Sequence, residues 1–402
     1  MLLKGKRIVL GITGSIAAYK SVFLLRELIK AGAEVQVIIT HAAAGFVTPL
    51  TLSTLAGRSV LSEILKDNDS GTWNNHVELA LWADLMIIAP ASSNTMSKMV
   101  TGQADNLLLL TFMSAKCPVF FAPAMDLDMY QHGSTKNNIE KLQQYGHHLI
   151  PAEKGELASG LEGEGRMAEP LNIIRNINEF LENLLPLRGL KVLVTAGPTY
   201  ELIDPVRFIG NFSSGKMGFA IAESFASKGA EVTLVCGPTH LVTQNSAINR
   251  IDVVSAEEMF EACQQYHRES NIVVMSAAVA DYRPETSGSQ KIKKENTKGL
   301  QINLVRNPDI LKWMGEHKPA GQLLVGFALE THDANTNAQK KLEAKNLDLI
   351  VLNTLEHEGA GFGFDTNKVS FIGRENKSIS FELKSKVEVA EDLVVYLQKM
   401  LP

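Results

Sequence analysis

Each half of the chain begins in the same way, with a hydrophobic run that leads into a glycine-containing turn and then into a helical pattern. The first run is Arg7–Ile12, before the turn at Gly14 and Ser15, and the second is 191–195, before Gly197. Similar runs lie at 34–40, 85–89, 119–122, Glu231–Cys236, 272–276, 323–327 and 348–352. Strands that alternate with helices predict parallel sheets with helices on both faces. We therefore expect an α/β fold with two doubly wound domains.

Length and composition agree with two globular domains. A domain usually has about 100–200 residues, and the chain has 402. Pro186 and Gly189 mark a break, which predicts domains at 1–188 and 189–402. A net charge of −5 argues against nucleic-acid binding through bulk charge. We find no apolar stretch of membrane-spanning length, no secretory cleavage site and no CxxC pair, so we expect a cytoplasmic protein without nucleic-acid or membrane partners.

Small hydroxyl and amide side chains follow the strand expected at 85–89. Ser92, Asn94 and Thr95 lie in the segment PASSNT, and Asp105 lies in GQADN. In an open parallel sheet, ligands bind beyond the carboxyl ends of the strands, and the N–H groups that begin a helix attract phosphate. The first glycine turn does not fit GxGxxG, so it does not indicate NAD. Taken alone, it is equally compatible with a turn that binds nothing.

Together with Thr40 and the segment HVEL at His76, these motifs resemble the homo-oligomeric FMN-containing cysteine decarboxylases. The resemblance implies a flavodoxin-like domain and a catalytic role for His76, although a lone histidine is more often structural or merely exposed. The implied FMN-binding residues are Gly14, Ser15, Thr40, Ser92, Asn94, Thr95 and Asp105. A flavin suits this chemistry, because oxidation of the substrate's CH2–SH group to a thioaldehyde creates the electron sink that loss of CO2 requires.

Two positions depart from the pattern of that family. Asp126, which shares the segment PAMDLDMY with Met129, replaces an asparagine expected to meet the substrate carboxylate. Ser159 replaces a cysteine expected to donate a proton, and a serine hydroxyl is a far weaker acid than a thiol. An ionised aspartate repels a carboxylate unless a nearby cation offsets the repulsion, and Arg166 is a candidate for that cation. We favour a natural subtype with adjusted roles, because both residues change within otherwise intact motifs. The alternative is a domain that only oxidises its substrate and releases an ene-thiol.

The second half contains a glycine-rich segment, 210–218 (GNFSSGKMG), that nearly fits the P-loop pattern. We reject a Walker A site because Met217 stands where the Mg2+-binding hydroxyl is needed, and because a long loop precedes the segment. Ser213 and Ser214, at an expected helix start, still suit a phosphate. Lysines at 291–294 alone would predict a solvated face. A second lysine group at 341–345, also beside strand ends, instead suggests a polyphosphate clamp.

In order, these segments resemble the CTP-using bacterial phosphopantothenate–cysteine ligases. Residues 6–397 as a whole therefore resemble the bifunctional decarboxylase–ligase family of coenzyme A biosynthesis. The resemblance implies a Rossmann-like ligase domain in which Asn211 stabilises an acyl-cytidylate, Lys291 assists its formation and Arg207 binds substrate. Asp281 is the implied metal ligand, and Asp126, Met129 and Arg166 are the implied substrate contacts of the first domain. The implied CTP site comprises Met275, Ser276, Ala277, Asp281, Lys291, Asn307, Pro308, Asp309, Ile310, Phe327, Lys341 and Lys345.

The resemblance implies that the chain converts 4′-phosphopantothenate into 4′-phosphopantetheine. Phosphopantothenate, cysteine and CTP would be its small-molecule partners, with FMN and Mg2+ (or Mn2+) as cofactors. Lysines and the metal would neutralise charge when a carboxylate attacks the α-phosphate. A dodecamer of flavin-domain trimers and ligase-domain dimers is also implied, because the FMN sites of the family lie between subunits. Two rival functions stay open: a ligase whose flavin domain only oxidises, and a non-catalytic flavin-binding regulatory subunit.

Overall fold

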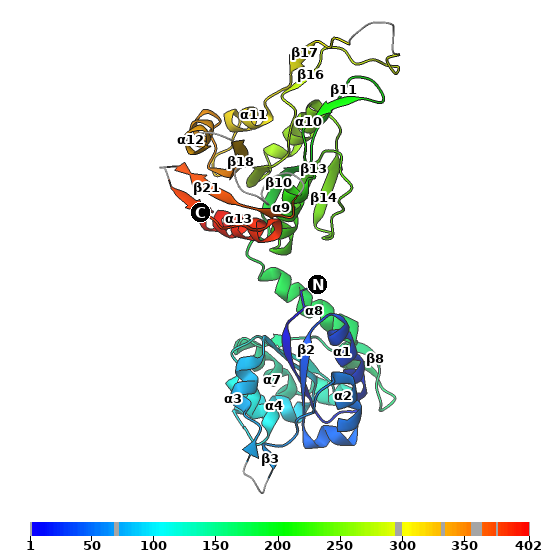
Figure 1. The fold of residues 1–402 in the computed structure, drawn as a ribbon. Coiled ribbons are helices and arrows are strands. Elements are labelled where there is room, and N and C mark those ends of the chain that lie inside the picture. The colour runs from blue at the N-terminus through cyan, green and yellow to red at the C-terminus, as the bar shows by residue number, and fades with distance from the viewer. Residues whose placement is uncertain are drawn as a thin grey trace. The chain divides into compact units, whose positions relative to one another are not determined.

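The computed structural model describes residues 2–67, 72–293, 300–330, 334–354, 364–374 and 377–401. The chain divides into two compact units, Met1–Asn183 and Leu184–Pro402 (Figure 1). Each unit is built around its own predominantly parallel sheet, which confirms the α/β class and the two parallel sheets expected from the sequence. None of the helices in the described ranges has both the length and the apolar character that crossing a membrane requires.

The first unit contains a five-stranded parallel sheet with the order β2-β1-β5-β6-β7. Its strands are β1 (Arg7–Ile12), β2 (Glu34–Ile39), β5 (Leu85–Ala91), β6 (Val119–Pro123) and β7 (His148–Leu149). Counted along the chain, the order is 2-1-3-4-5, which is that of flavodoxin-like folds. The strand order reverses between β1 and β5, so a ligand is expected at the carboxyl ends of these two strands.

Helices cover both faces of this sheet, because successive side chains of each strand point to opposite sides. Ile8 and Leu10 of β1 belong to one hydrophobic cluster, whereas Val9 belongs to another. The first face is covered by α1 (Ala18–Lys30), α2 (Pro49–Ala56) and α8 (Pro170–Asn183). The second is covered by α3 (His76–Trp82), α4 (Ser93–Thr101), α5 (Leu107–Ser114) and α7 (Gly133–Gln144). The remaining elements of the unit are η1 (His41–Gly45), α6 (Leu127–Gln131) and the ribbons β3 (Leu65–Asp67) with β4 (Thr72–Trp73) and β8 (Glu153–Glu156) with β9 (Glu162–Arg166).

The core-facing side of α1 is formed by its leucines rather than by its aromatic residues. The helix buries Leu24, Leu25 and Leu28, whereas Tyr19 and Phe23 are 50% and 58% exposed. The helical period of the apolar residues predicts a helix but leaves two apolar faces to choose between. The packing of α1 against β1 and β2 determines which of the two faces is buried.

The second unit contains an eight-stranded sheet with the order β14-β13-β10-β15-β18-β19-β21-β22. Its strands are β10 (Lys191–Ala196), β13 (Glu231–Cys236), β14 (Ile248–Asp252), β15 (Ile272–Met275), β18 (Leu323–Glu330), β19 (Leu349–Thr354), β21 (Val369–Gly373) and β22 (Ser378–Ser380). The first six in the sheet order are parallel, and their order along the chain is 3-2-1-4-5-6, as in a Rossmann fold. The last two are antiparallel additions.

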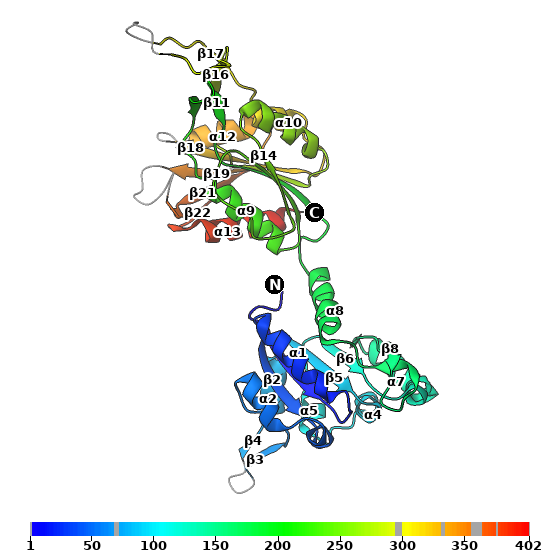
Figure 2. The same cartoon turned by 90° about the vertical axis from the view of Figure 1, so that its right-hand side faces the viewer.

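Helices cover both faces of this sheet, and Figure 2 shows α9 (Lys216–Ser227) and α13 (Lys386–Met400) on one side and α10 (Ala256–His267) and α12 (Ala334–Ala344) on the other. Helix α11 (Ile310–Glu316) belongs to the same group as α10 and α12. Short antiparallel pairs project from the sheet: β11 (Tyr200–Leu202) with β12 (Phe208–Gly210), β16 (Tyr282–Pro284) with β17 (Leu304–Arg306), and β20 (Thr366–Asn367) with β23 (Lys384–Ser385).

Candidate functional sites

A pocket of about 940 Å³ lies at the switch point of the first unit. It is formed by the segments that follow the carboxyl ends of β1, β2, β5 and β6. Among the residues that line it are Gly14, Ser15, Thr40, Ser92, Asn94, Thr95, Asp105, Asp126, Met129, Ser159 and Arg166. The structure thus brings together every residue that the sequence analysis selected in this unit except His76.

The turn between β5 and α4 is held by hydroxyl groups. Ser92 is the N-cap of α4, where its Oγ accepts a hydrogen bond from the Thr95 backbone N–H at 3.3 Å. The Thr13 hydroxyl, which is fully buried, donates to the Pro90 carbonyl at 2.7 Å and accepts from the Ser92 N–H at 2.9 Å. These bonds join the end of β1 to the end of β5, so the two sides of the pocket form one framework.

The pocket fits a flavin mononucleotide in two respects. A Cβ atom at Gly14 would lie 2.6 Å from the Ala42 Cβ, so only glycine allows the β1 turn to approach this closely. Within the part of the chain that the structure describes, the Thr40 Oγ1 atom in the same wall is buried and has no hydrogen-bond partner. A buried hydroxyl in this condition is costly unless a ligand or water satisfies it. Both features suit a polar ligand at the carboxyl ends of β1 and β2.

The cations of the pocket already have carboxylate partners. Lys20 is only 4% exposed and donates to the Met167 carbonyl at 2.8 Å and to Glu169 at 3.0 Å. Arg166 also donates to Glu169, at 2.8 Å. The Lys20 hydrogen bond, helped by both positive charges, holds the pKa of Glu169 below its usual range. Arg166 is therefore a weaker counter-charge for a ligand than its sequence position suggested.

Asp126 and Ser159 contact each other across this pocket. The Ser159 hydroxyl donates to Asp126 Oδ1 at 3.1 Å, and the same oxygen accepts from the Leu127 N–H at 2.6 Å. Asp126 is the N-cap of α6, so its carboxylate is oriented by the helix start. Among the described residues no cation pairs with Asp126.

His76 does not line the pocket of its own chain. It is the first residue of α3, whose N-cap is Asn75, and its ring packs edge-on against Trp73 with 5.4 Å between centroids. Its Nδ1 atom is buried and has no hydrogen-bond partner within the described chain. The structure therefore does not place His76 with the other residues selected in this unit.

The second unit has a smaller pocket, of about 170 Å³, which is lined by the last residues of β18 and β19 and by the residues that follow β15. One wall is the helix start at Ser213, Ser214 and Gly215, and another includes the predicted residues Ser276, Ala277 and Phe327. Gly215, with φ of 78°, is the N-cap of α9 and has no side-chain cap, so the first N–H groups of the helix are available to an anion. The glycine-rich segment starts at the last residue of β12, a hairpin strand outside the main sheet. We had expected a long loop before this segment, so that expectation was wrong.

The other residues predicted for nucleotide binding do not line this pocket. Lys345 pairs with Asp309 at 2.8 Å, and Lys341 donates to the Phe327 carbonyl at 3.4 Å. Asn307 donates from its side chain to the Ala280 carbonyl, and its backbone N–H donates to the Asp281 carbonyl, both within 3 Å. Met275 is the last residue of β15, Ile310 is buried at the start of α11, and Pro308 is half-buried beside them.

Arg207, Asn211 and Lys291 lie outside this pocket. The Asn211 amide donates to the Val279 carbonyl at 2.9 Å. Arg207 forms an ion pair with the fully buried Asp204 and donates to the Ile292 carbonyl at 2.6 Å, while Asp204 accepts from the Ile292 N–H at 3.2 Å. Arg207 and Asp204 thus hold the backbone next to Lys291. Lys294, at the end of the first lysine group, lies outside the described residues.

Several pocket residues escaped the sequence analysis. In the first unit these include Lys20 and Lys98, and Lys98 forms an ion pair with Asp105. In the second, Asn353, Asn367 and Lys386 complete the pocket, and the side-chain oxygens of both asparagines are buried without a partner among the described residues. Lys20 and Lys98 stand in the helical segments just after the motifs at Gly14 and Ser92, where a lysine reads as an ordinary helix residue. Asn353, Asn367 and Lys386 stand far along the chain from the motifs, so no local signal marked them. In the described ranges there is no group of three or more His, Cys, Asp or Glu side chains that could hold a metal.

Two α/β units, each with a polar pocket at the carboxyl edge of a parallel sheet, define the structural class of the chain. Residues 2–182 match the family described as Flavoprotein, and residues 187–401 match DFP, described as the DNA/pantothenate metabolism flavoprotein C-terminal domain. The coenzyme A biosynthesis bifunctional protein CoaBC of Haemophilus influenzae is 46% identical over 394 residues, which are 98% of this chain and 97% of that protein. The chain therefore belongs to the family of coenzyme A biosynthesis bifunctional proteins.

Two further proteins are similar to this chain. A protein named cysteine/cysteine sulfinic acid decarboxylase, from an unknown prokaryotic organism, is 51% identical over 352 residues, which are 87% of this chain and 98% of that protein. Among solved structures, the C-terminal domain of a coenzyme A biosynthesis bifunctional protein CoaBC is 41% identical and covers 54% of this chain and 97% of its own, with a TM-score of 0.46.

Proposed function

We propose that the chain catalyses two consecutive steps of coenzyme A biosynthesis. Residues 189–402 join 4′-phosphopantothenate to cysteine with CTP, and residues 1–188 decarboxylate the product to 4′-phosphopantetheine. The main support is that the predicted flavin-unit residues, apart from His76, line one pocket in a chain that is 46% identical to a protein named as a bifunctional protein of coenzyme A biosynthesis. A cytoplasmic location suits these substrates.

In the first unit, bound FMN supplies a hydride acceptor and donor for the thiol carbon of the substrate. Gly14 and Ser15 would receive the phosphate, and Thr40, Ser92, Asn94, Thr95 and Asp105 would hold the rest of the cofactor. Asp126 and Ser159 lie together on another part of the wall, where Ser159 is exposed and able to deliver a proton. We assign the final protonation to this pair.

In the second unit, the free N–H groups at the start of α9 and the lysines at 341 and 345 would bind the triphosphate of CTP. Mg2+ would be held chiefly by the phosphates, with Asp281 as a protein ligand, as is usual for this cation. Lys291 would neutralise charge as the carboxylate of phosphopantothenate attacks the α-phosphate, and Asn211 would donate to the acyl-cytidylate. Arg207, held by Asp204, supports the segment that carries Lys291.

The assembly is part of the proposal. His76 lies outside the pocket of its own chain, so a neighbouring subunit is needed if it is to serve the flavin site. Trimers of the flavin unit would supply that neighbour, and dimers of the ligase unit would link the trimers into a dodecamer.

One reconstitution tests the proposal. The purified yellow protein is supplied with CTP, Mg2+, phosphopantothenate and cysteine, and the final thiol is identified by mass. We expect CMP, CO2 and saturated 4′-phosphopantetheine. An ene-thiol product would mean that the flavin unit only oxidises, and bound FMN with neither CO2 release nor CTP consumption would indicate a regulatory subunit.

A second candidate function is decarboxylation of a free amino acid such as cysteine or cysteine sulfinic acid. The relative that is 51% identical is named for that activity. A free amino acid carries an α-ammonium group, which phosphopantothenoylcysteine lacks, and Asp126 is a carboxylate without a cationic partner in the described chain. The two functions separate when CTP and phosphopantothenate are omitted, because only the second then releases CO2 from cysteine.

A further inference from the structure

Helix α11 contacts Lys345 at both of its ends. At the amino end, the carboxylate of the N-cap Asp309 lies 2.8 Å from the Lys345 ammonium. At the carboxyl end, Gly315 lies against the Lys345 backbone, where an added Cβ would stand 1.8 Å from the carbonyl oxygen and 2.7 Å from the carbonyl carbon. Real Cβ atoms do not approach other atoms this closely. Any side chain at position 315 must therefore displace the backbone of Lys345.

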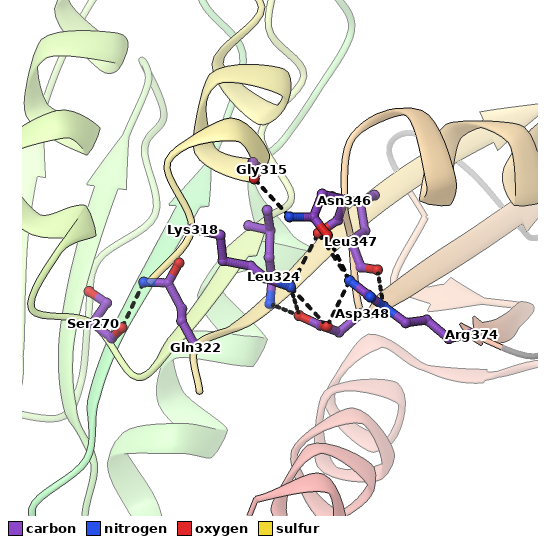
Figure 3. A network of polar contacts seen from close by, with 9 residues as sticks. All are labelled: Ser270, Gly315, Lys318, Gln322, Leu324, Asn346, Leu347, Asp348 and Arg374. Atoms are coloured by element: carbon purple, nitrogen blue, oxygen red, sulfur yellow. Dashed lines mark hydrogen bonds and ion pairs between the residues drawn. The ribbon is translucent and has the colours of Figure 1, made fainter. Parts of the chain in front are cut away.

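Asn346, the residue after Lys345, also binds to α11 and so fixes the turn at residues 345–346. Asn346 follows the end of α12 with φ of 51°, a left-handed conformation that asparagine tolerates better than most residues. Its side-chain amide donates to the Gly315 carbonyl at 2.9 Å, as Figure 3 shows. The bond ties the backbone after Lys345 to the end of α11.

A half-buried ionic cluster anchors the opposite side of the turn (Figure 3). Lys318 donates to the Asn346 carbonyl at 3.2 Å and to both carboxylate oxygens of Asp348, at 2.9 and 2.8 Å. Arg374 donates to the Asn346 side-chain oxygen at 2.9 Å. The side chains of Lys318 and Asp348 are only 12% and 14% exposed, so water screens their attraction weakly. The turn is thus held from two sides.

We propose that Gly315 and Asn346 are positioning residues for Lys345, and that α11 sets where the Lys345 ammonium meets the nucleotide. This inference rests on the proposed CTP site. A lysine has a flexible four-carbon stem, so its charge is well placed only if its backbone and its tip are both restrained. Asp309 restrains the tip, and Gly315 with Asn346 restrains the backbone.

The test is the full-length Gly315→Ala variant in the CTP-dependent ligation assay. We expect the KM for CTP to rise about tenfold, with the KM for cysteine changed by less than about twofold at saturating CTP. A nucleotide-binding titration without the other substrates should show the same weakening for CTP. Gly373→Ala is the matched control, because a Cβ there meets nothing closer than 3.5 Å in the same unit, and its KM for CTP should stay unchanged.

The outcomes separate this inference from the proposed function. If the wild-type chain neither binds nor consumes CTP, the proposed function fails. If the wild type does so and folded Gly315→Ala keeps its affinity for CTP, the positioning role is overturned. Should Gly315→Ala not fold, Asn346→Gly decides, because glycine accepts the left-handed conformation and only the side-chain bonds are lost. We expect its KM for CTP to rise about threefold, and an unchanged value would overturn the inference.

Discussion

The Ser159 hydroxyl donates a hydrogen bond to the Asp126 carboxylate at 3.1 Å, so the two residues that depart from the pattern of the flavin family form one pair. The pair lies in the wall of the large pocket of the first unit. A paired change in contacting residues indicates that the two side chains act together.

The first prediction concerns Ser159. Since the general-acid contribution to a reaction is typically about 100-fold or more, Ser159→Ala should lower the yield of saturated thiol by about that factor. Each bound FMN should still release one CO2, because the oxidative half-reaction does not need the hydroxyl and leaves the flavin reduced. The measurement is the mass of the thiol product beside the CO2 released. Ser53→Ala, at a site away from the pocket, should behave as wild type, and unaltered product from Ser159→Ala would remove the hydroxyl from the mechanism.

The second prediction concerns the charge of Asp126. Asn at this position keeps the helix cap of α6 and the shape of the side chain but removes the negative charge. We expect the KM for phosphopantothenoylcysteine to fall about fivefold and the KM for free cysteine to rise by a similar factor, because repulsion of a carboxylate and attraction of an ammonium are both lost. Rates of CO2 release measure both values, and a parallel change for the two substrates would contradict the assigned role.

The third prediction concerns His76 and the assembly. His76→Gln should retain FMN but lose decarboxylation, whereas Gly14→Val should lose FMN, because its side chain would meet Ala42. When the two inactive variants are mixed in one oligomer, about a quarter of the sites receive an intact pocket and an intact histidine, so about a quarter of the activity should return.

The control for this mixing experiment is His76→Gln combined with the double variant that carries both changes. No pairing in that mixture supplies the histidine, so it should stay inactive. Mixed oligomers verified by native mass spectrometry that show no recovery with the two single variants would place His76 outside the chemistry.

The fourth prediction concerns pH and Asp204. Burial by itself raises the pKa of this carboxyl, but the backbone N–H groups of Val206, Ile292 and Arg207 outweigh burial, and the pKa lies below the usual range. A depressed pKa adds stability above the pKa of an unfolded aspartate, about 3.9, and that stability is lost as pH falls through the folded value. Asp204→Asn should therefore lower the melting temperature near pH 7. The difference in melting temperature between the variant and the wild type should become smaller below about pH 4.

Asp204→Asn should also slow ligation about tenfold, because the amide N–H cannot accept the Ile292 bond that supports the segment of Lys291. Decarboxylation of ready-made phosphopantothenoylcysteine, measured on the same sample, should be unaffected. A pH-independent difference in melting temperature, or equal losses in both activities, would count against this role.

Local patterns predicted the elements well because they depend on neighbouring residues. β1 has the bounds of its apolar run, and so does β13. The choice of buried face on α1 was not predictable, because large side chains suited to burial, Phe23 and the leucines, lie on both sides of the helix. Short polar motifs also located most of the first pocket, since each follows a strand whose carboxyl end faces the same edge.

Strand and helix periods and turn chemistry are local properties, and they were enough to predict two α/β sheets with parallel strands and the motifs at their carboxyl edges. Only the tertiary structure decided which distant side chains meet: Lys20 with Glu169, Ser159 with Asp126, and Lys345 with both ends of α11. It also left His76 outside the pocket of its own chain. Such contacts depend on strand order and helix packing, which no local segment encodes.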